Sequence, residues 1–163
     1  MRNQNFSNKD PQTNFEFQNG GFFCTNCNFF IPINKEMSTK NRNHCPKCLY
    51  SKHVDDEQSG DRKSKCFCPM KPVSLTLKKV KSDKYKKEQF GELMIVHECT
   101  GCQKLSINRI AADDTIETLK KLFQDSLILN DEYIKRLEKN EITIISNENK
   151  SEVDIQLFGK QTN

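Results

Sequence analysis

The eight cysteines of this 163-residue chain stand in four close pairs, and these pairs are its clearest candidates for chemistry. Three pairs have two residues between the cysteines, and the third pair along the chain has one. Two thiolates at such a spacing in a tight turn can bind one metal ion at about 2.3 Å. Eight sulfurs complete two tetrahedral sites. We therefore predict two zinc ions, with the ligands Cys24, Cys27, Cys45, Cys48, Cys66, Cys68, Cys99 and Cys102.

Zinc is the preferred metal because all-sulfur tetrahedral sets select zinc or iron–sulfur clusters, and these spacings match neither ferredoxin pattern. An iron site is the minor alternative. Only 34% of the residues are apolar and 29% are charged, so the aliphatic core must be small. Structural zinc contributes about 10 to 16 kcal/mol per ion, comparable with the stability of a whole domain. We expect the metals to decide whether the chain folds.

The assignment of ligands to ions follows from a predicted β-hairpin. Apolar and polar residues alternate over residues 73–78, and residues 93–97 are mostly apolar, which predicts two strands. An antiparallel hairpin places the start of its first strand beside the end of its second. The last two cysteine pairs would then share one ion and the first two pairs the other. An interleaved arrangement of the ligands is the alternative.

The fourth ligand of the second site is open. Cys66 and Cys68 form the least regular pair, so His44, His53 or His97 could replace Cys68 at the ion. Histidines beside metal ligands also donate hydrogen bonds to sulfurs or carbonyls. We favour that supporting role for His44 and His53.

The rest of the chain predicts a basic loop within the zinc-binding part and a helical and β extension after it. Asp114 and Glu117 resemble a capping box that starts a helix, and Asn130 resembles the N-cap of a second helix. Two further runs, residues 141–146 and 153–158, are strand-like. Six lysines lie between the hairpin strands, and they are Lys78, Lys79, Lys81, Lys84, Lys86 and Lys87.

The predicted fold class is α+β: a small two-zinc ribbon-type module with a β-hairpin, followed by a short helical and β extension. We divide the chain into a disordered Asn- and Gln-rich arm over residues 1–20, the zinc-binding module over 21–112, and the C-terminal extension over 113–163. The longest apolar run has four residues, so no membrane span is expected. The arm lacks the apolar segment of a secretory signal, which indicates a cytoplasmic protein with metal sites rather than disulfides.

The residues around the second cysteine pair resemble a known family. Arg42, Asn43, His44, Cys45 and Pro46 match the signature of the RNHCP family of small bacterial proteins. The likeness spans roughly residues 22–114 and includes Cys48, Leu49, Ser51, His53, Val54, Asp55, Gly60, Asp61, Arg62, Cys66, Met70, Pro72, His97, Cys99, Cys102, Asn108, Arg109, Ile110, Ala111, Asp113 and Asp114.

The resemblance implies a zinc-ribbon-type module whose biochemical role is not established. Similar sequences tend to carry glycine where this chain has Cys68, which makes His53 or His97 a stronger candidate for the fourth ligand. The extension from Thr115 onward is absent or different in these sequences.

Charge points to a nucleic-acid partner. Residues 1–112 hold 19 Lys and Arg against 11 Asp and Glu, whereas residues 113–163 hold 7 against 11. A basic module with a lysine loop is typical of proteins that bind RNA or a ribonucleoprotein such as the ribosome. The alternative without a nucleic-acid partner is that the lysines form a solvated loop and that four phenylalanines, Phe22, Phe23, Phe29 and Phe30, cover the metal sites. For the phenylalanines we prefer this alternative. A scaffold that holds a protein partner through the C-terminal extension is the second functional hypothesis.

An enzyme is not expected. The sequence Cys45-Pro-Lys-Cys48 would be a redox motif only at a helix start in a βαβ unit, which this cysteine-rich region does not offer. Asp113 and Asp114 stand where a helix should begin and are interpreted as capping residues. Closed four-ligand sites leave no position for a reactive water, so we predict no catalytic residues.

Overall fold

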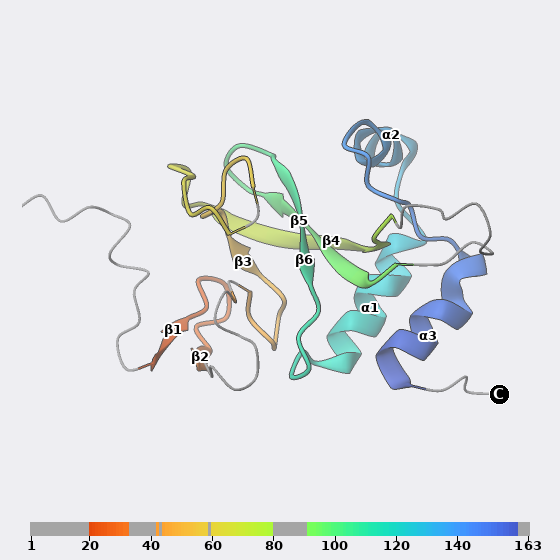
Figure 1. Cartoon of the computed structure of the whole chain (residues 1–163), viewed down its shortest axis with the longest axis horizontal. Coiled ribbons are helices and arrows are strands. Elements are labelled where there is room, and N and C mark those ends of the chain that lie inside the picture. Colours follow the sequence, from red (N-terminus) through yellow and green to blue (C-terminus); the bar gives the residue numbers. More distant parts are fainter. Residues whose placement is uncertain (1–19, 33–41, 43, 59, 80–90, 160–163) are drawn as a thin grey trace, which may run out of the picture.

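The computed structural model describes residues 20–32, 42, 44–58, 60–79 and 91–159, and the fold is given for these residues. They form a two-stranded sheet, a four-stranded antiparallel sheet and three α-helices, so the predicted α+β class is confirmed. Figure 1 shows the small sheet at one end of the molecule and the helices toward the other.

The small sheet is a hairpin of β1 (Gly21–Phe23) and β2 (Phe30–Pro32). Phe22 faces Ile31 across the pair, and both side chains are buried with the first and third cysteines in a separate apolar cluster. A Cβ at Gly21 would lie 2.3 Å from the carbonyl oxygen of Ile31. This close approach of the two backbones explains why glycine starts the hairpin.

The larger sheet has the order β3-β4-β5-β6, and all its neighbouring strands are antiparallel. Its strands are β3 (Ser51–Lys52), β4 (Pro69–Leu77), β5 (Leu93–Cys99) and β6 (Leu105–Arg109). The predicted hairpin is therefore confirmed. Met70 near the start of β4 faces Cys99 at the end of β5, so the last two cysteine pairs lie together at one end of these two central strands.

The main core lies between this sheet and two helices, α1 (Ile116–Ser126) and α3 (Lys150–Phe158). Figure 1 shows both helices on the same side of the sheet. The core also contains Leu49, which follows the second cysteine pair and is completely buried. The buried residues of this cluster are Leu49, Leu75, Leu77, Leu93, Ile95, Leu119, Leu122, Phe123, Ile145 and Val153.

The two predicted C-terminal strands are wrong. Residues 142–146 belong to no helix or strand of the described chain, and the second run lies within α3. Val153 and Leu157 are four residues apart, so the same alternation that resembles a strand also places two apolar side chains on one helix face. Ser146 and Asn149 form a capping box just before the helix, and that box starts helical structure here.

The helix starts divide into one correct and one wrong prediction. Asn130 caps α2 (Asp131–Lys139), because its side chain accepts a 2.8 Å hydrogen bond from the backbone N–H of Tyr133. Asp114, in contrast, does not cap α1. Thr115 is the N-cap residue, its side chain makes no capping bond within the described chain, and Asp114 is occupied elsewhere.

Helix α2 is fixed to the larger sheet by polar contacts with Glu98 on β5. The Tyr133 hydroxyl donates a 2.6 Å hydrogen bond to the Glu98 carboxylate, and Arg136 forms an ion pair with the same group. Arg136 also donates to the carbonyl oxygen of Gln103, just after the last cysteine. The C-terminal extension therefore packs on the zinc-binding module.

Two predicted features lie outside the described residues. The N-terminal arm falls there over residues 1–19. Of the six loop lysines, Lys78 and Lys79 are described and exposed, and Lys81, Lys84, Lys86 and Lys87 lie outside.

Candidate metal centres

Three of the four cysteine pairs are built on the same backbone turn. The residue after the second cysteine adopts a left-handed conformation in each, with φ of 55° at Asn28, 61° at Leu49 and 62° at Gln103. In each turn the N–H of that residue donates to the carbonyl of the first cysteine, and the N–H of the first cysteine donates to a carbonyl five residues on, at 2.8–3.0 Å. We call these turns knuckles. Their conformation aims both thiols to the same side.

The first centre combines two knuckles and holds the sulfurs of Cys24, Cys27, Cys45 and Cys48 within 4.8 Å of one another. Cys24 and Cys48 sulfurs are 3.5 Å apart, and those of Cys27 and Cys45 are 3.6 Å apart. Four thiolates at about 2.3 Å around one tetrahedral zinc are about 3.8 Å apart, so the group fits the ion. A disulfide would need about 2.05 Å, and all eight cysteines are free.

The thiols of the first centre favour metal over isolated thiolates. Burial raises the pKa of Cys45 and Cys48 above the usual thiol range, because a buried charge is costly. Burial also opposes ionisation of Cys27, but hydrogen bonds from the Phe29 backbone and the other sulfurs lower its pKa. A divalent cation would offset the cost of four close negative charges, since metal binding requires deprotonated cysteines.

The second centre brings together His53, Cys66, Cys99 and Cys102 where β4 begins and β5 ends in the larger sheet. Cys66 and Cys99 sulfurs are 3.5 Å apart, and His53 Nδ1 lies 3.3 Å from the Cys102 sulfur. Three thiolates and one imidazole nitrogen form a zinc set with all four positions filled. The two groups together fit two zinc ions, and the ligands pair sequentially, as the hairpin argument predicts.

His53 stands in the second group where the sequence prediction placed Cys68. Cys68 lies outside the four-donor group formed by the described residues, although its sulfur is close to those of Cys66 and Cys99. The pair Cys66/Cys68 does not form a knuckle. Instead its loop is hydrogen-bonded to the His53 backbone, with Cys68 O accepting from His53 N at 3.0 Å and His53 O accepting from Phe67 N at 3.1 Å. Sequence alone could not decide between His53 and Cys68, because both donors suit zinc.

The other two candidate histidines support the fold instead of a metal. His97 is fully buried on β5, where its Nε2–H donates a 2.6 Å hydrogen bond to the carbonyl oxygen of Leu49 and its Nδ1 accepts from Asn108. Burial lowers the His97 pKa to about 3, so the ring is neutral. The bond to Leu49 fixes the left-handed residue of the second knuckle.

A buried ion-pair network joins the second knuckle to the start of α1. Arg42 donates two 2.6 Å hydrogen bonds to Asp113 and one to Asp114. The ring of His44 contacts Asp114 at 2.9 Å, and the Asp114 side chain is completely buried. The sequence prediction missed this network, because its partners are about 70 residues apart. The only signal was that all four residues belong to the family-like pattern.

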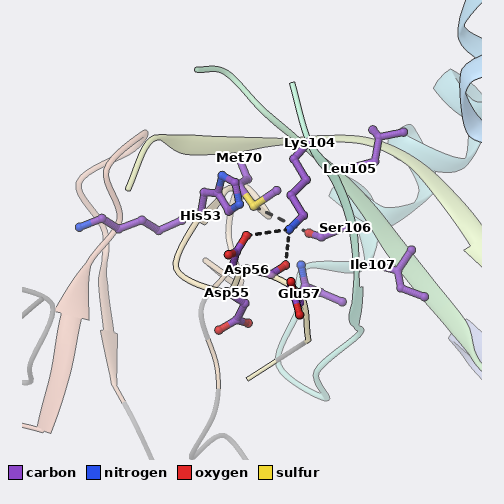
Figure 2. A pocket seen from close by; sticks show the side chains of 11 residues that line it. His53, Asp55, Asp56, Glu57, Met70, Lys104, Leu105, Ser106 and Ile107 are labelled. Carbon is purple, nitrogen blue, oxygen red and sulfur yellow. Dashed lines mark hydrogen bonds and ion pairs between the residues drawn. The ribbon is translucent and has the colours of Figure 1, made fainter. Parts of the chain in front are cut away.

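A hollow of about 220 Å³ adjoins the second centre. Figure 2 shows His53 and Met70 on one wall and Lys104 extending toward Asp56. Lys104 donates to the backbone oxygen of Asp56 and forms a 3.3 Å ion pair with its carboxylate, and Ser106 donates to the Met70 sulfur. The wall of the hollow beside the second centre is therefore polar, and Lys104 partly neutralises the charge of its Asp56 carboxylate.

The phenylalanines near the first centre are not all core residues. Phe22 is buried and Phe30 half-buried, whereas Phe23 is 60% exposed and Phe29 is 41% exposed. The covering role expected for the four rings holds for Phe22 and only partly for Phe30. The other two rings are on the surface.

The RNHCP domain family model matches residues 19–120 of the chain. The chain belongs to the RNHCP domain family. The match covers both metal groups and ends within α1, and it confirms the resemblance inferred from the residues around Cys45. No curated protein and no solved structure matches the chain. Within the described residues, no helix is both long enough and apolar enough to cross a membrane.

The geometry gives a physical reason for the RNHCP signature. Cys45 supplies a metal ligand, and Pro46 accepts a 2.8 Å hydrogen bond from Thr115, the N-cap residue of α1. Arg42 and His44 hold the two aspartates that precede this helix. The RNHCP signature thus connects the first zinc centre to the helix that covers the larger sheet.

Proposed function

We propose that this RNHCP protein is a non-catalytic zinc-binding module that binds single-stranded RNA or single-stranded parts of a ribonucleoprotein, such as the ribosome. The observation that carries the proposal is the Phe23–Phe29 surface, defined as Phe23, Phe29 and Lys47. Phe23 and Phe29 are both exposed next to the first centre, and the Lys47 ammonium lies over the Phe29 ring. Nucleic-acid bases stack on such rings, and each stacked base contributes about 1–3 kcal/mol.

The Phe23–Phe29 surface is attached to the first centre. Phe23 immediately precedes Cys24, and Phe29 closes the first knuckle through its carbonyl oxygen. The ring of Phe23 packs edge-on against Phe30, with 5.2 Å between centroids. The Lys47 ammonium lies 5.6 Å from the centre of the Phe29 ring, which places a phosphate-binding charge beside a stacking platform.

Charge supports the same partner. The net charge of residues 1–112 is +8, and the lysine loop and Lys47 belong to this part. If all six loop lysines contact single-stranded phosphates, they contribute about −4 to the slope of log K against log salt concentration.

The test measures binding of the zinc-loaded full chain to a fluorescent mixed-sequence single-stranded RNA. We expect Phe23→Ala combined with Phe29→Ala to weaken binding at least about tenfold. Ile128→Ala is the matched control, since Ile128 is 81% exposed and lies in the C-terminal extension. Binding absent at low salt, or equal for the double variant and the control, would overturn the proposal.

A protein-interaction scaffold is the second candidate, and the exposed Ile128 is the observation that favours it. The extension otherwise packs on the module through α1, α3 and the Glu98 contacts. Recovery of one stoichiometric protein partner after nuclease treatment, lost in Ile128→Asp, would favour this candidate over RNA.

We also propose that the protein is not an enzyme and that it works in the cytoplasm. Both donor groups supply four ligands, which closes a zinc ion to substrate. Eight free cysteines suit a reducing compartment.

A further inference from the structure

The second centre offers five donors for four positions around a metal ion. The Cys68 sulfur lies 2.5 Å from the point where a Cβ on Gly101 would stand, and the Cys66 sulfur lies 3.5 Å from the same point. Gly101 is inside the knuckle between Cys99 and Cys102, and Cys68 also interacts with the sulfurs of Cys66 and Cys99. Cys68 is therefore at the edge of the donor group rather than remote from it.

His53 is the least supported ligand of the group. Its ring is buried, at 4% exposure, yet Nε2 has no hydrogen-bond partner among the described residues. Histidines that bind metals almost always donate their second N–H to a carboxylate, carbonyl or water, which fixes the ring and raises its basicity. Cys99, in contrast, is fixed by its knuckle and accepts a hydrogen bond from the N–H of Cys102 at 3.5 Å.

The backbones of the two competing residues are already paired. Hydrogen bonds join His53 N to Cys68 O and Phe67 N to His53 O, at 3.0 and 3.1 Å. This backbone pairing holds the two residues side by side, so the exchange of one ligand for the other does not require the two segments to separate.

We infer that Cys68 is a reserve ligand, so that the second centre binds a thiophilic divalent cation with either three cysteines and His53 or four cysteines. In the exchange, the bond from the metal to His53 Nδ1 breaks and a bond to the Cys68 sulfur forms. The Cys68 thiol proton passes to solvent, and the net charge of the metal and its ligands changes from −1 to −2. Softer metals favour thiolates, so cadmium shifts the centre toward four cysteines more than zinc does.

Cobalt titration tests the reserve role, because its absorption reports the number of thiolate ligands. We compare His53→Phe, which keeps a ring but no donor nitrogen, with Cys68→Ser and with the double variant. We expect two cobalt ions in the wild type and in each single variant, and one in the double variant. More sulfur-to-cobalt charge transfer is expected in His53→Phe than in Cys68→Ser. One cobalt ion in His53→Phe, as in the double variant, would overturn the inference.

Cadmium-113 NMR decides the question without altering His53. We expect both signals of the cadmium-loaded wild type at positions typical of four thiolates, and one of them displaced in Cys68→Ser by an imidazole ligand. The signal of the first centre is the internal control for folding. Identical spectra for the two proteins would contradict the inference.

Discussion

The two metal centres are built in different ways. The first consists of two matching knuckles, and among the described residues its own apolar cluster has four buried members, Phe22, Ile31 and the two cysteines Cys24 and Cys45. The second has one knuckle, a cysteine from an irregular loop and a histidine, but it sits at the end of strands that share the ten-residue main core. The centre with the more regular ligand geometry has the smaller apolar cluster, and the centre with the irregular geometry adjoins the larger one. The first centre should therefore depend more on its metal.

The largest effect is expected from Cys24→Ser. The chain should then bind one zinc ion, and the β1–β2 hairpin should unfold locally, because its few apolar contacts cannot replace about 10 kcal/mol or more of metal binding. Native mass spectrometry gives the metal count, and hydrogen exchange gives the local protection.

The matched change at the second centre is Cys102→Ser combined with Cys68→Ser, because either substitution alone leaves four donors. It should also lose one zinc ion, yet β4 and β5 should stay protected away from their metal-bound ends. Equal loss of protection in both sheets for either variant would contradict the distinction between the centres.

Next in size is the effect of breaking the ion-pair network that joins the second knuckle to the start of α1. Arg42→Met leaves the buried Asp114 carboxylate without its guanidinium partner, which should cost about 3–5 kcal/mol of unfolding free energy in denaturant. Lys150→Ala removes an exposed ion pair with Asp154 within one helix and should cost no more than about 0.5 kcal/mol. Similar losses for the two variants would show that the buried network is not structural.

An intermediate effect is expected at Gly101 in the second centre. Gly101→Ala places a methyl group 2.5 Å from the Cys68 sulfur, and such overpacking typically costs about 1–3 kcal/mol. Cys68→Gly should remove most of that cost in the double variant. Additive effects in thermal unfolding would show that the two side chains do not meet.

The smallest effect belongs to the loop before Cys66. Backbone N–H groups of Asp56 and Gln58 donate to the Asp61 carboxylate and lower its pKa from 3.8 to about 2. The carboxylate supports the loop above pH 3.8, and this support is lost as the pH falls through about 2. Carbon-detected NMR of the zinc-loaded chain should show the Asp61 carboxyl still ionised down to the pH at which zinc is released, and protonation with a midpoint near 3.8 before zinc release would refute the loop contacts.

Patterns that are local in the sequence predicted much of the fold. The features that the prediction missed depend on contacts between residues far apart in the chain. Cysteine spacing and strand alternation were sufficient for the first metal group, for three ligands of the second and for the β4–β5 hairpin. The run that contains Val153 and Leu157 was predicted as a strand and forms a helix. Residues four positions apart lie on one face of a helix, and they also lie on one face of a strand. The prediction of Asp114 as a helix cap is wrong because Arg42 binds its carboxylate, and no local pattern connects two residues that are 72 positions apart. The choice of His53 over Cys68 depends on the three-dimensional position of both donors.

Anomalous diffraction at the zinc edge tests the central claim of two separate, sequentially paired zinc centres most directly. The account predicts two zinc peaks per chain, one bonded at about 2.3 Å to the sulfurs of Cys24, Cys27, Cys45 and Cys48. The second peak should be bonded to Cys66, Cys99 and Cys102, with His53 or Cys68 as its fourth ligand. A single peak, or a peak shared between the first and second ligand groups, would contradict it.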